Sequence, residues 1–128
     1  MEVFERAAAA GGQLLQVERL APAVDGDDTA ALLLTFDVGR ILVSLDSATA
    51  RLVATHVSAA GDGVPRGAVN ANEEEPWWRL LGSALVRVAV TEDATCLRLD
   101  FRIAGAASRT LALVSDGVRL RASIESDR

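Results

Sequence analysis

Alternation of apolar and polar residues is the sequence feature that most constrains how this chain can fold. In segment 95–103, for example, Arg98, Asp100 and Arg102 separate apolar residues at every second position. A period of two is typical of β-strands that bury one face and expose the other. The segments that show it are 14–20, 31–36, 40–45, 51–57, 85–90, 95–103, 109–115 and 118–124. We therefore expect about eight antiparallel strands, joined by turns.

Two short segments favour helices instead. Segment 2–10 is rich in alanine, a strong helix former, and ends at a pair of glycines. Segment 76–81 begins with proline, follows three glutamates and ends before a glycine, which is the usual punctuation of a helix. Segment 58–72 carries several Gly and Pro residues and indicates a loop. The sequence therefore predicts an α+β fold, mainly antiparallel sheet, in which two short helices cover a face or an end.

The last two alternating segments favour a tight hairpin. Asp116 and Gly117 lie between them, and this dipeptide is a strong signal for a two-residue turn. Such a turn would pair Leu113 with Leu120 and would keep the apolar residues of both strands on one face.

The two halves of the chain, residues 1–57 and 73–124, resemble each other. The matching patterns are Gly11-x-x-Leu14-Leu15-x-Val17 with Gly82-x-x-Leu85-Val86-x-Val88, Leu32-x-Leu34-x-Phe36 with Leu97-x-Leu99-x-Phe101, and Ile41-x-Val43 with Leu111-x-Leu113. One explanation is a duplicated unit of one helix and four strands. The other is that all amphipathic meanders look alike, because few residue types fit them. With 128 residues the chain has room for one domain, which we expect to span 1–128.

Composition excludes several classes of function. The net charge is −5, so the chain gains little from contact with phosphates and we expect no nucleic-acid partner. No apolar run approaches the ~20 residues that span a bilayer, which argues against a membrane protein. The single cysteine cannot form an internal disulfide, and the first residues lack the basic and apolar regions of a signal peptide. We therefore expect a cytoplasmic protein.

The residue types that carry catalysis are scarce. The chain has no lysine or tyrosine, one histidine, His56, and one cysteine, Cys96. A hydrolytic triad or a histidine-based metal site needs further groups around such residues. The acidic cluster 25–28 is typical of a hairpin turn, and the cluster 73–75 of a helix start. We therefore expect no catalytic residue, no metal site and no cofactor, in a protein that is not an enzyme.

Trp77 and Trp78 are the most informative pair for binding. Neighbouring residues on a helix point about 100° apart, so both cannot face the centre of the core. Either one tryptophan packs over the sheet while the other is partly exposed, or both lie in a groove between helix and sheet. Glu73, Glu74 and Glu75 come directly before the pair. These five residues are the candidate binding surface, an aromatic anchor with an acidic rim.

The C-terminal half also carries a longer motif. It consists of Pro76-Trp77-Trp78-x-Leu80-Leu81-Gly82, Leu85-x-x-Val88, Leu97-x-Leu99-x-Phe101 and the Ser115-Asp116-Gly117 hairpin. In these residues the chain resembles small bacterial domains of unknown function, some of which occur in toxin-immunity cassettes. The resemblance implies a small stand-alone α+β domain and carries over no catalytic residue.

These observations lead to two main hypotheses about function, with an unrecognised carboxylate-dependent enzyme as a third. The first is a non-enzymatic interaction protein, such as an immunity-type inhibitor, that binds a basic protein partner through its acidic surface. The alternative is a small-ligand-binding α+β domain with a pocket near Trp77 or Trp78. A homodimer stays open, because exposed strand edges can pair across a dimer interface.

Overall fold

The computed structural model describes residues 2–20, 31–46, 48–57, 69–74, 77–102, 108–115 and 120–125. Two segments are helical, namely α1 (Glu2–Ala9) and the 3-10 helix η1 (Trp77–Arg79). The strands are β1 (Leu14–Leu20), β2 (Ala31–Phe36), β3 (Gly39–Leu45), β4 (Leu52–Val57), β5 (Val69–Asn70), β6 (Ala84–Val90), β7 (Cys96–Arg102), β8 (Arg109–Ser115) and β9 (Leu120–Glu125).

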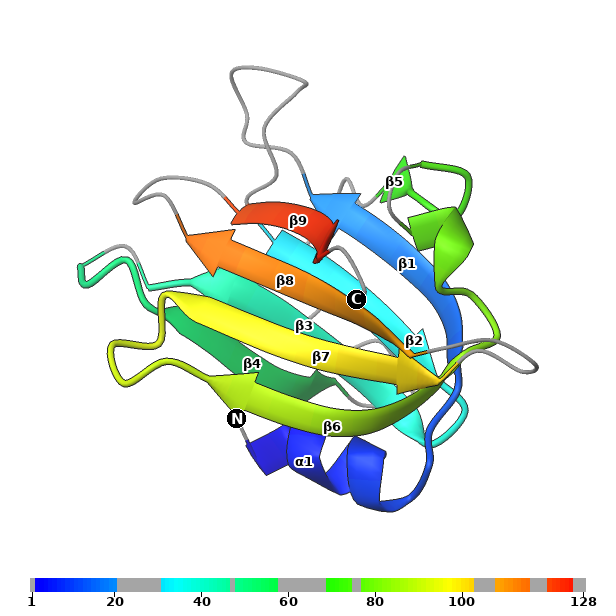
Figure 1. Ribbon diagram of the computed structural model, residues 1–128. Helices are drawn as coiled ribbons and strands as arrows, with labels where there is room; N and C mark the ends of the chain where they lie inside the picture. The colour runs from blue at the N-terminus through cyan, green and yellow to red at the C-terminus, as the bar shows by residue number, and fades with distance from the viewer. Residues whose placement is uncertain are drawn as a thin grey trace.

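The strands form two antiparallel sheets that lie one over the other (Figure 1). The five-stranded sheet has the order β4-β3-β2-β1-β5, and the four-stranded sheet has the order β6-β7-β8-β9. Each sheet contains a four-strand meander, β1 to β4 or β6 to β9, in which neighbours in sequence pair with each other. The predicted α+β fold with mainly antiparallel sheet is therefore confirmed.

The described residues contain nine strands rather than eight, because β5 forms inside a segment expected to be a loop. β5 has two residues and pairs with the edge of β1, where Val69 lies opposite Arg19 and Asn70 lies opposite Glu18. A strand this short leaves no alternating pattern in the sequence, so periodicity could not predict it.

The expected second helix, 76–81, is a single 3-10 turn, η1, in the structure. Trp77 and Leu80 are both buried, because a spacing of three residues places both side chains on one face of such a turn. Gly82 then adopts a φ of +82°, and its N–H donates to the Leu14 carbonyl at 2.7 Å. This contact directs the chain into β6, so the helix ends before it can lengthen.

The predicted register of the last hairpin is wrong by two residues. Leu113 lies opposite Ala122 rather than Leu120, which instead lies opposite Ser115. The connection therefore spans positions 116–119, which lie outside the described residues together with the predicted Asp–Gly turn. A shift of two preserves the alternation and leaves Leu113 facing the core, so the apolar pattern alone could not distinguish the two registers.

The core lies between the sheets and gathers their inward side chains. Its fully buried members include Phe4, Phe101, Leu14, Leu34, Leu80, Leu85, Leu97, Leu99, Leu111 and Leu113. α1 lies against β6 and β4 and closes one side of the sandwich (Figure 1). From α1, Phe4 places its ring 6.4 Å from that of Phe36 in an edge-to-face contact. Burial of these apolar side chains is the main contribution to stability.

The two meanders correspond to each other in register. Leu14 of β1 lies opposite Phe36 of β2, and Leu85 of β6 lies opposite Phe101 of β7. Directly after Leu14, and again directly after Leu85, the pairing register shifts at a β-bulge. The residues that match in the sequence of the two halves therefore also match in strand pairing.

The starts of β1 and β6 exchange backbone hydrogen bonds. The Leu14 N–H donates to the Ser83 carbonyl at 3.0 Å, and the Leu85 N–H donates to the Gly12 carbonyl at 2.8 Å. Gly12 precedes Leu14 by the same spacing as Ser83 precedes Leu85, so the exchange is reciprocal. The arrangement is that of two structurally equivalent units, while a duplication in evolution stays a prediction.

Candidate functional site

Those expected binding residues that the structure describes follow β5 in the chain, on a segment whose start is held at the edge of β1. The Ala71 N–H donates to the Val17 carbonyl at 2.8 Å, which continues the pairing beyond β5. The Val17 N–H donates to Oδ1 of Asn72 at 2.8 Å. The Asn72 side chain thus supplies the acceptor that a further strand residue would have supplied, and it holds the segment against β1.

Glu74 is the second attachment of this segment to β1. Nε of Arg19 lies 2.8 Å from Oε1 and 3.1 Å from Oε2 of Glu74. The pair is partly buried, and the Glu74 carbonyl also accepts the Trp78 N–H at 3.2 Å. Glu74 therefore anchors η1 to the five-stranded sheet, a role that differs from the exposed acidic rim expected of it.

The two tryptophans take different environments. Trp77 is 3% exposed and joins Leu80 in the core, whereas Trp78 is 49% exposed. The guanidinium carbon of Arg79 lies 4.4 Å from the centre of the Trp78 ring, a cation–π contact. Of the two arrangements considered from the sequence, the structure therefore has the one with a single buried tryptophan.

We define the Trp78 surface as Glu73, Trp78 and Arg79, the exposed residues of η1 and of the described segment between β5 and η1. Glu75 lies outside the described residues, so its place relative to this surface is not assigned. The sequence interpretation missed Arg79, because the expected α-helix gave no reason to place it over the preceding ring. The surface consequently combines an aromatic side chain with one charge of each sign.

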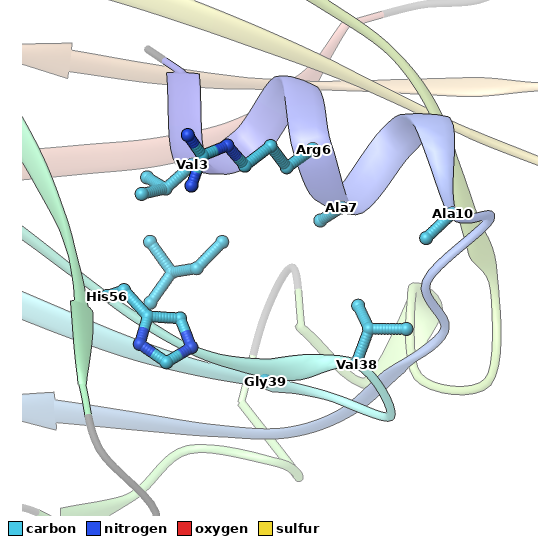
Figure 2. A pocket seen from close by; sticks show the side chains of 8 residues that line it. Val3, Arg6, Ala7, Ala10, Val38, Gly39 and His56 are labelled. Carbon is cyan, nitrogen blue, oxygen red and sulfur yellow. The ribbon is translucent and has the colours of Figure 1, made fainter.

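A pocket of about 320 Å³ lies elsewhere, between α1 and the strands β3 and β4. We call it the α1–β4 pocket, and it is lined by Val3, Arg6, Ala7, Ala10, Val38, Gly39, Ile41 and His56. Figure 2 shows Arg6 and His56 on opposite sides of the opening. Neither tryptophan lines it, so this pocket differs in position from the one expected near the tryptophan pair.

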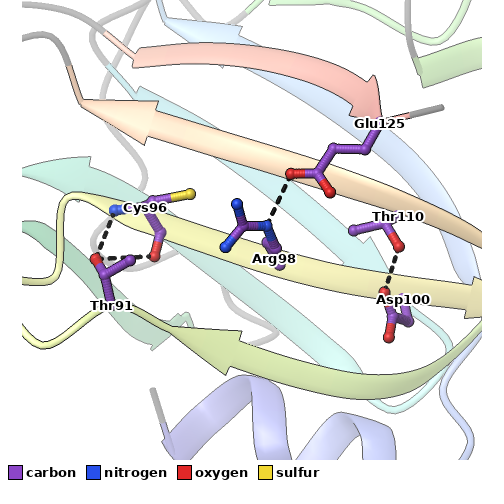
Figure 3. A network of polar contacts seen from close by, with 6 residues as sticks. All are labelled: Thr91, Cys96, Arg98, Asp100, Thr110 and Glu125. Carbon is purple, nitrogen blue, oxygen red and sulfur yellow. Dashed lines mark hydrogen bonds and ion pairs between the residues drawn. The ribbon is translucent and has the colours of Figure 1, made fainter.

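The outer face of the four-stranded sheet carries a polar network (Figure 3). Arg98 donates from Nε to Glu125 at 2.7 Å, and the Thr110 hydroxyl donates to Asp100 at 2.6 Å. The hydrogen bond to Glu125 raises the pKa of the Arg98 guanidinium. These contacts join β7 to β8 and β9 across the sheet surface.

Cys96 lies at the start of this face and is partly exposed as a free thiol. Its backbone N–H donates to the Thr91 hydroxyl oxygen at 3.1 Å, and its carbonyl accepts the Thr91 backbone N–H at 3.0 Å. In the adjoining turn, Asp93 accepts hydrogen bonds from the hydroxyls of Thr91 and Thr95, both at 2.8 Å. These bonds, with that of the Thr95 N–H, lower the pKa of the Asp93 carboxyl. The arrangement is that of a stabilised β-turn.

Comparison with protein-family models, curated proteins and solved structures finds no match to this chain. None of the helices in the described ranges is long and apolar enough to cross a membrane. Among the same residues, no three His, Cys, Asp or Glu side chains gather where they could hold a metal ion. The Trp78 surface and the α1–β4 pocket are therefore the features from which a function can be inferred.

Proposed function

We propose that the chain is a non-enzymatic protein-interaction domain that binds its partner through the Trp78 surface. The observation that carries the proposal is the half-exposed Trp78 ring on a turn that is attached to β1 through Glu74 before it and Gly82 after it. Tryptophan and arginine are among the residue types most enriched in the energetic centres of protein interfaces. Trp78 and Arg79 present both types in one stacked pair.

Rigid presentation is what makes this pair suited to binding. Trp77 and Leu80, on either side of the pair in sequence, are buried in the core, and Glu74 holds the start of the turn on Arg19. Because little conformational freedom remains to be lost, more of the contact energy is available for affinity.

Charge supports a basic partner of the kind that an immunity-type inhibitor would bind. The chain carries a net charge of −5, which accelerates encounter with a positively charged protein. Glu73 is exposed on the segment that leads to η1 and is the acid in the described part of this surface that can contact such a partner. We place this interaction in the cytoplasm, in keeping with the single free cysteine.

The test is capture from native bacterial lysate at low salt, followed by affinity measurement with the purified partner. Wild-type protein should capture one stoichiometric protein, and Trp78→Ala should lower the affinity by about 30-fold. Val114→Ala is the control, because Val114 is also an exposed apolar residue but lies on the outer face of the four-stranded sheet. Glu73→Gln should slow association and weaken its salt dependence.

Equal affinity of the wild-type protein and Trp78→Ala for the captured partner would disprove the surface assignment. Light scattering on the purified chain adds one further outcome. A dimer that dissociates on Trp78→Ala substitution would make the partner a second copy of the chain, and would contradict the proposal of a basic protein partner.

A further inference from the structure

The α1–β4 pocket combines two polar side chains with an apolar floor. We propose that it binds a small aliphatic carboxylate, with the carboxylate between Arg6 and His56 and the hydrocarbon chain on Ile41 and Val38. This site is separate from the Trp78 surface, and the inference does not depend on the proposed protein interaction.

One wall of the pocket is a face of α1, extended by Ala10, which directly follows the helix. Val3, Arg6, Ala7 and Ala10 follow the spacing of three and four residues that places side chains on one side of a helix. The methyl side chains of Ala7 and Ala10 leave space where larger residues would fill it. The single long side chain on this face is the cationic Arg6, which reaches the opening (Figure 2).

The opposite wall is apolar and fixed in place. Ile41 is 3% exposed and forms the floor, while Val38 projects from the turn between β2 and β3. A Cβ added at Gly12 would lie 2.9 Å from Cγ2 of Val38, so the backbone before β1 packs directly against this side chain. A hydrocarbon chain of a ligand can therefore bury itself against a surface that is already ordered.

His56 sits on the rim in close contact with a glycine. A Cβ added at Gly39 would lie 3.0 Å from Nε2 of His56, and Gly39 has a φ of +145°, a conformation that favours glycine. In the described part of the chain, no hydrogen bond reaches the imidazole. An imidazole carries at least one N–H donor, so His56 can bond a carboxylate oxygen in the pocket.

The second meander provides an internal comparison for this residue. His56 lies opposite Ile41, and the corresponding pair between β8 and β9 is Ile124 opposite Leu111. Corresponding positions in the strand pairing of the two meanders therefore hold a hydrocarbon side chain in one half and the only histidine of the chain in the other. Packing of the strands does not require an imidazole at this position, because isoleucine fills it in the other half. The presence of His56 therefore indicates a role in the pocket.

Arg6 is available to a ligand because its present partner is exposed. Its guanidinium lies 2.6 Å from Glu2, and both side chains are about three-quarters exposed, at 76% and 74%. Ion pairs this exposed are weak and exchange readily. The planar guanidinium offers two parallel donors to a carboxylate, which makes arginine the preferred cation for such a group.

The size and polarity of the pocket limit the ligand. Its 320 Å³ lies at the small end of ligand sites. The apolar floor disfavours a compact, multiply charged anion such as phosphate, which would lose its hydration there. A monoanion with a short hydrocarbon chain matches the lining, because its charge can contact the two polar side chains and its hydrocarbon chain can contact the apolar floor.

The test is a titration of the full-length ¹⁵N-labelled protein followed by NMR. Hexanoate should shift the amides of α1 and of Gly39 to Ile41 in a saturable manner. Hexanamide, which has the same shape without the charge, should bind at least about tenfold more weakly. Inorganic phosphate should also bind more weakly than hexanoate. Saturable hexanoate shifts at these amides, with the other two ligands weaker, support the proposal.

Variants then assign the two polar groups. Arg6→Met should lower hexanoate affinity about tenfold, whereas Arg87→Met, the same change on an exposed arginine of β6, should leave it unchanged. His56→Ile, which installs the counterpart side chain, should lower it about fivefold. Glu2→Gln should raise it about twofold, because the carboxylate that competes for Arg6 is removed.

Several results would overturn the assignment. These are absence of saturable shifts around the pocket, equal binding of hexanoate and hexanamide, tighter binding of phosphate, or equal losses in Arg6→Met and Arg87→Met. Trp78→Ala should bind hexanoate like the wild-type protein. Failure of the Trp78 interaction and failure of this site are therefore distinguishable.

Discussion

The two meanders have the same strand order and pairing register, but they differ in the helical segment that precedes each of them. The first is preceded by α1, which stands against β3, β4 and β6 and leaves a pocket beside His56. The second is preceded by η1, which buries Trp77 and displays Trp78. Leu34 and Leu99, at corresponding positions of the two meanders, are both fully buried. Features that could serve binding thus lie where the halves differ, while the features they share belong to the core.

The sharpest test of whether the two meanders are equivalent is truncation of a core side chain at corresponding positions. Phe36→Ala and Phe101→Ala should each lower the free energy of unfolding by about 3–5 kcal/mol, because each leaves a large cavity at a corresponding position. Phe36 should show the larger loss, by about 0.5–1.5 kcal/mol, since its contact with Phe4 is also lost. Urea denaturation measures both. A loss confined to one variant would break the equivalence of the meanders.

The attachment of η1 can be tested with two neighbouring glutamates. Glu74→Gln should lower the free energy of unfolding by about 1 kcal/mol, because it removes the charge that Arg19 contacts in a partly exposed pair. Glu73→Gln, on the exposed neighbour, should change it by less than about 0.5 kcal/mol. Thermal unfolding of the two variants at neutral pH provides the comparison. Equal effects would show that Glu74 is not an anchor.

A smaller change in the free energy of unfolding is expected when one residue of the first meander is replaced by its counterpart from the second. His56→Ile should raise the free energy of unfolding by about 0.5 kcal/mol, because a β-branched side chain packs well beside Ile41 in the facing strand. Urea denaturation in the absence of any ligand measures the change. A marked destabilisation would mean that the imidazole contributes to strand packing. The comparison with Ile124 would then no longer support a role for His56 in the pocket.

The smallest expected effect is on the turn between β6 and β7. Hydrogen bonds from Thr91 and Thr95 lower the pKa of Asp93 below its ordinary value of 3.8 in the folded protein. The carboxylate therefore stabilises the fold above pH 3.8, and this contribution is lost as the pH falls through the lower folded-state pKa. Asp93→Asn should reduce the acid sensitivity of unfolding in that range. Identical pH profiles of variant and wild type would contradict the role of these bonds.

The sequence predicted the strands well because their signal is local. The bounds of β1, β2 and β8 coincide with alternating segments, and the matching patterns of the halves coincide in register. The register of the last hairpin failed because alternation is unchanged by a shift of two residues.

The candidate sites were less predictable because they depend on contacts between distant segments. Trp78 was identified, but its partner Arg79 and the Arg19–Glu74 anchor required the 3-10 turn to be known. Arg6 and His56 lie 50 positions apart in the chain and line one pocket only because α1 lies against β4. Nothing in the local pattern around either residue indicates that they line the same pocket.

The reciprocal hydrogen bonds between the starts of β1 and β6 have a consequence for synthesis of the chain. The Leu14 amide acquires its acceptor only when Ser83 has been made, and the Gly12 carbonyl waits for Leu85. On the ribosome the first meander therefore emerges with one whole apolar face uncovered, at a stage when exposed strands aggregate most readily. Chaperone dependence should accordingly fall only once β6 to β9 have emerged, because all four strands form the sheet that covers this face.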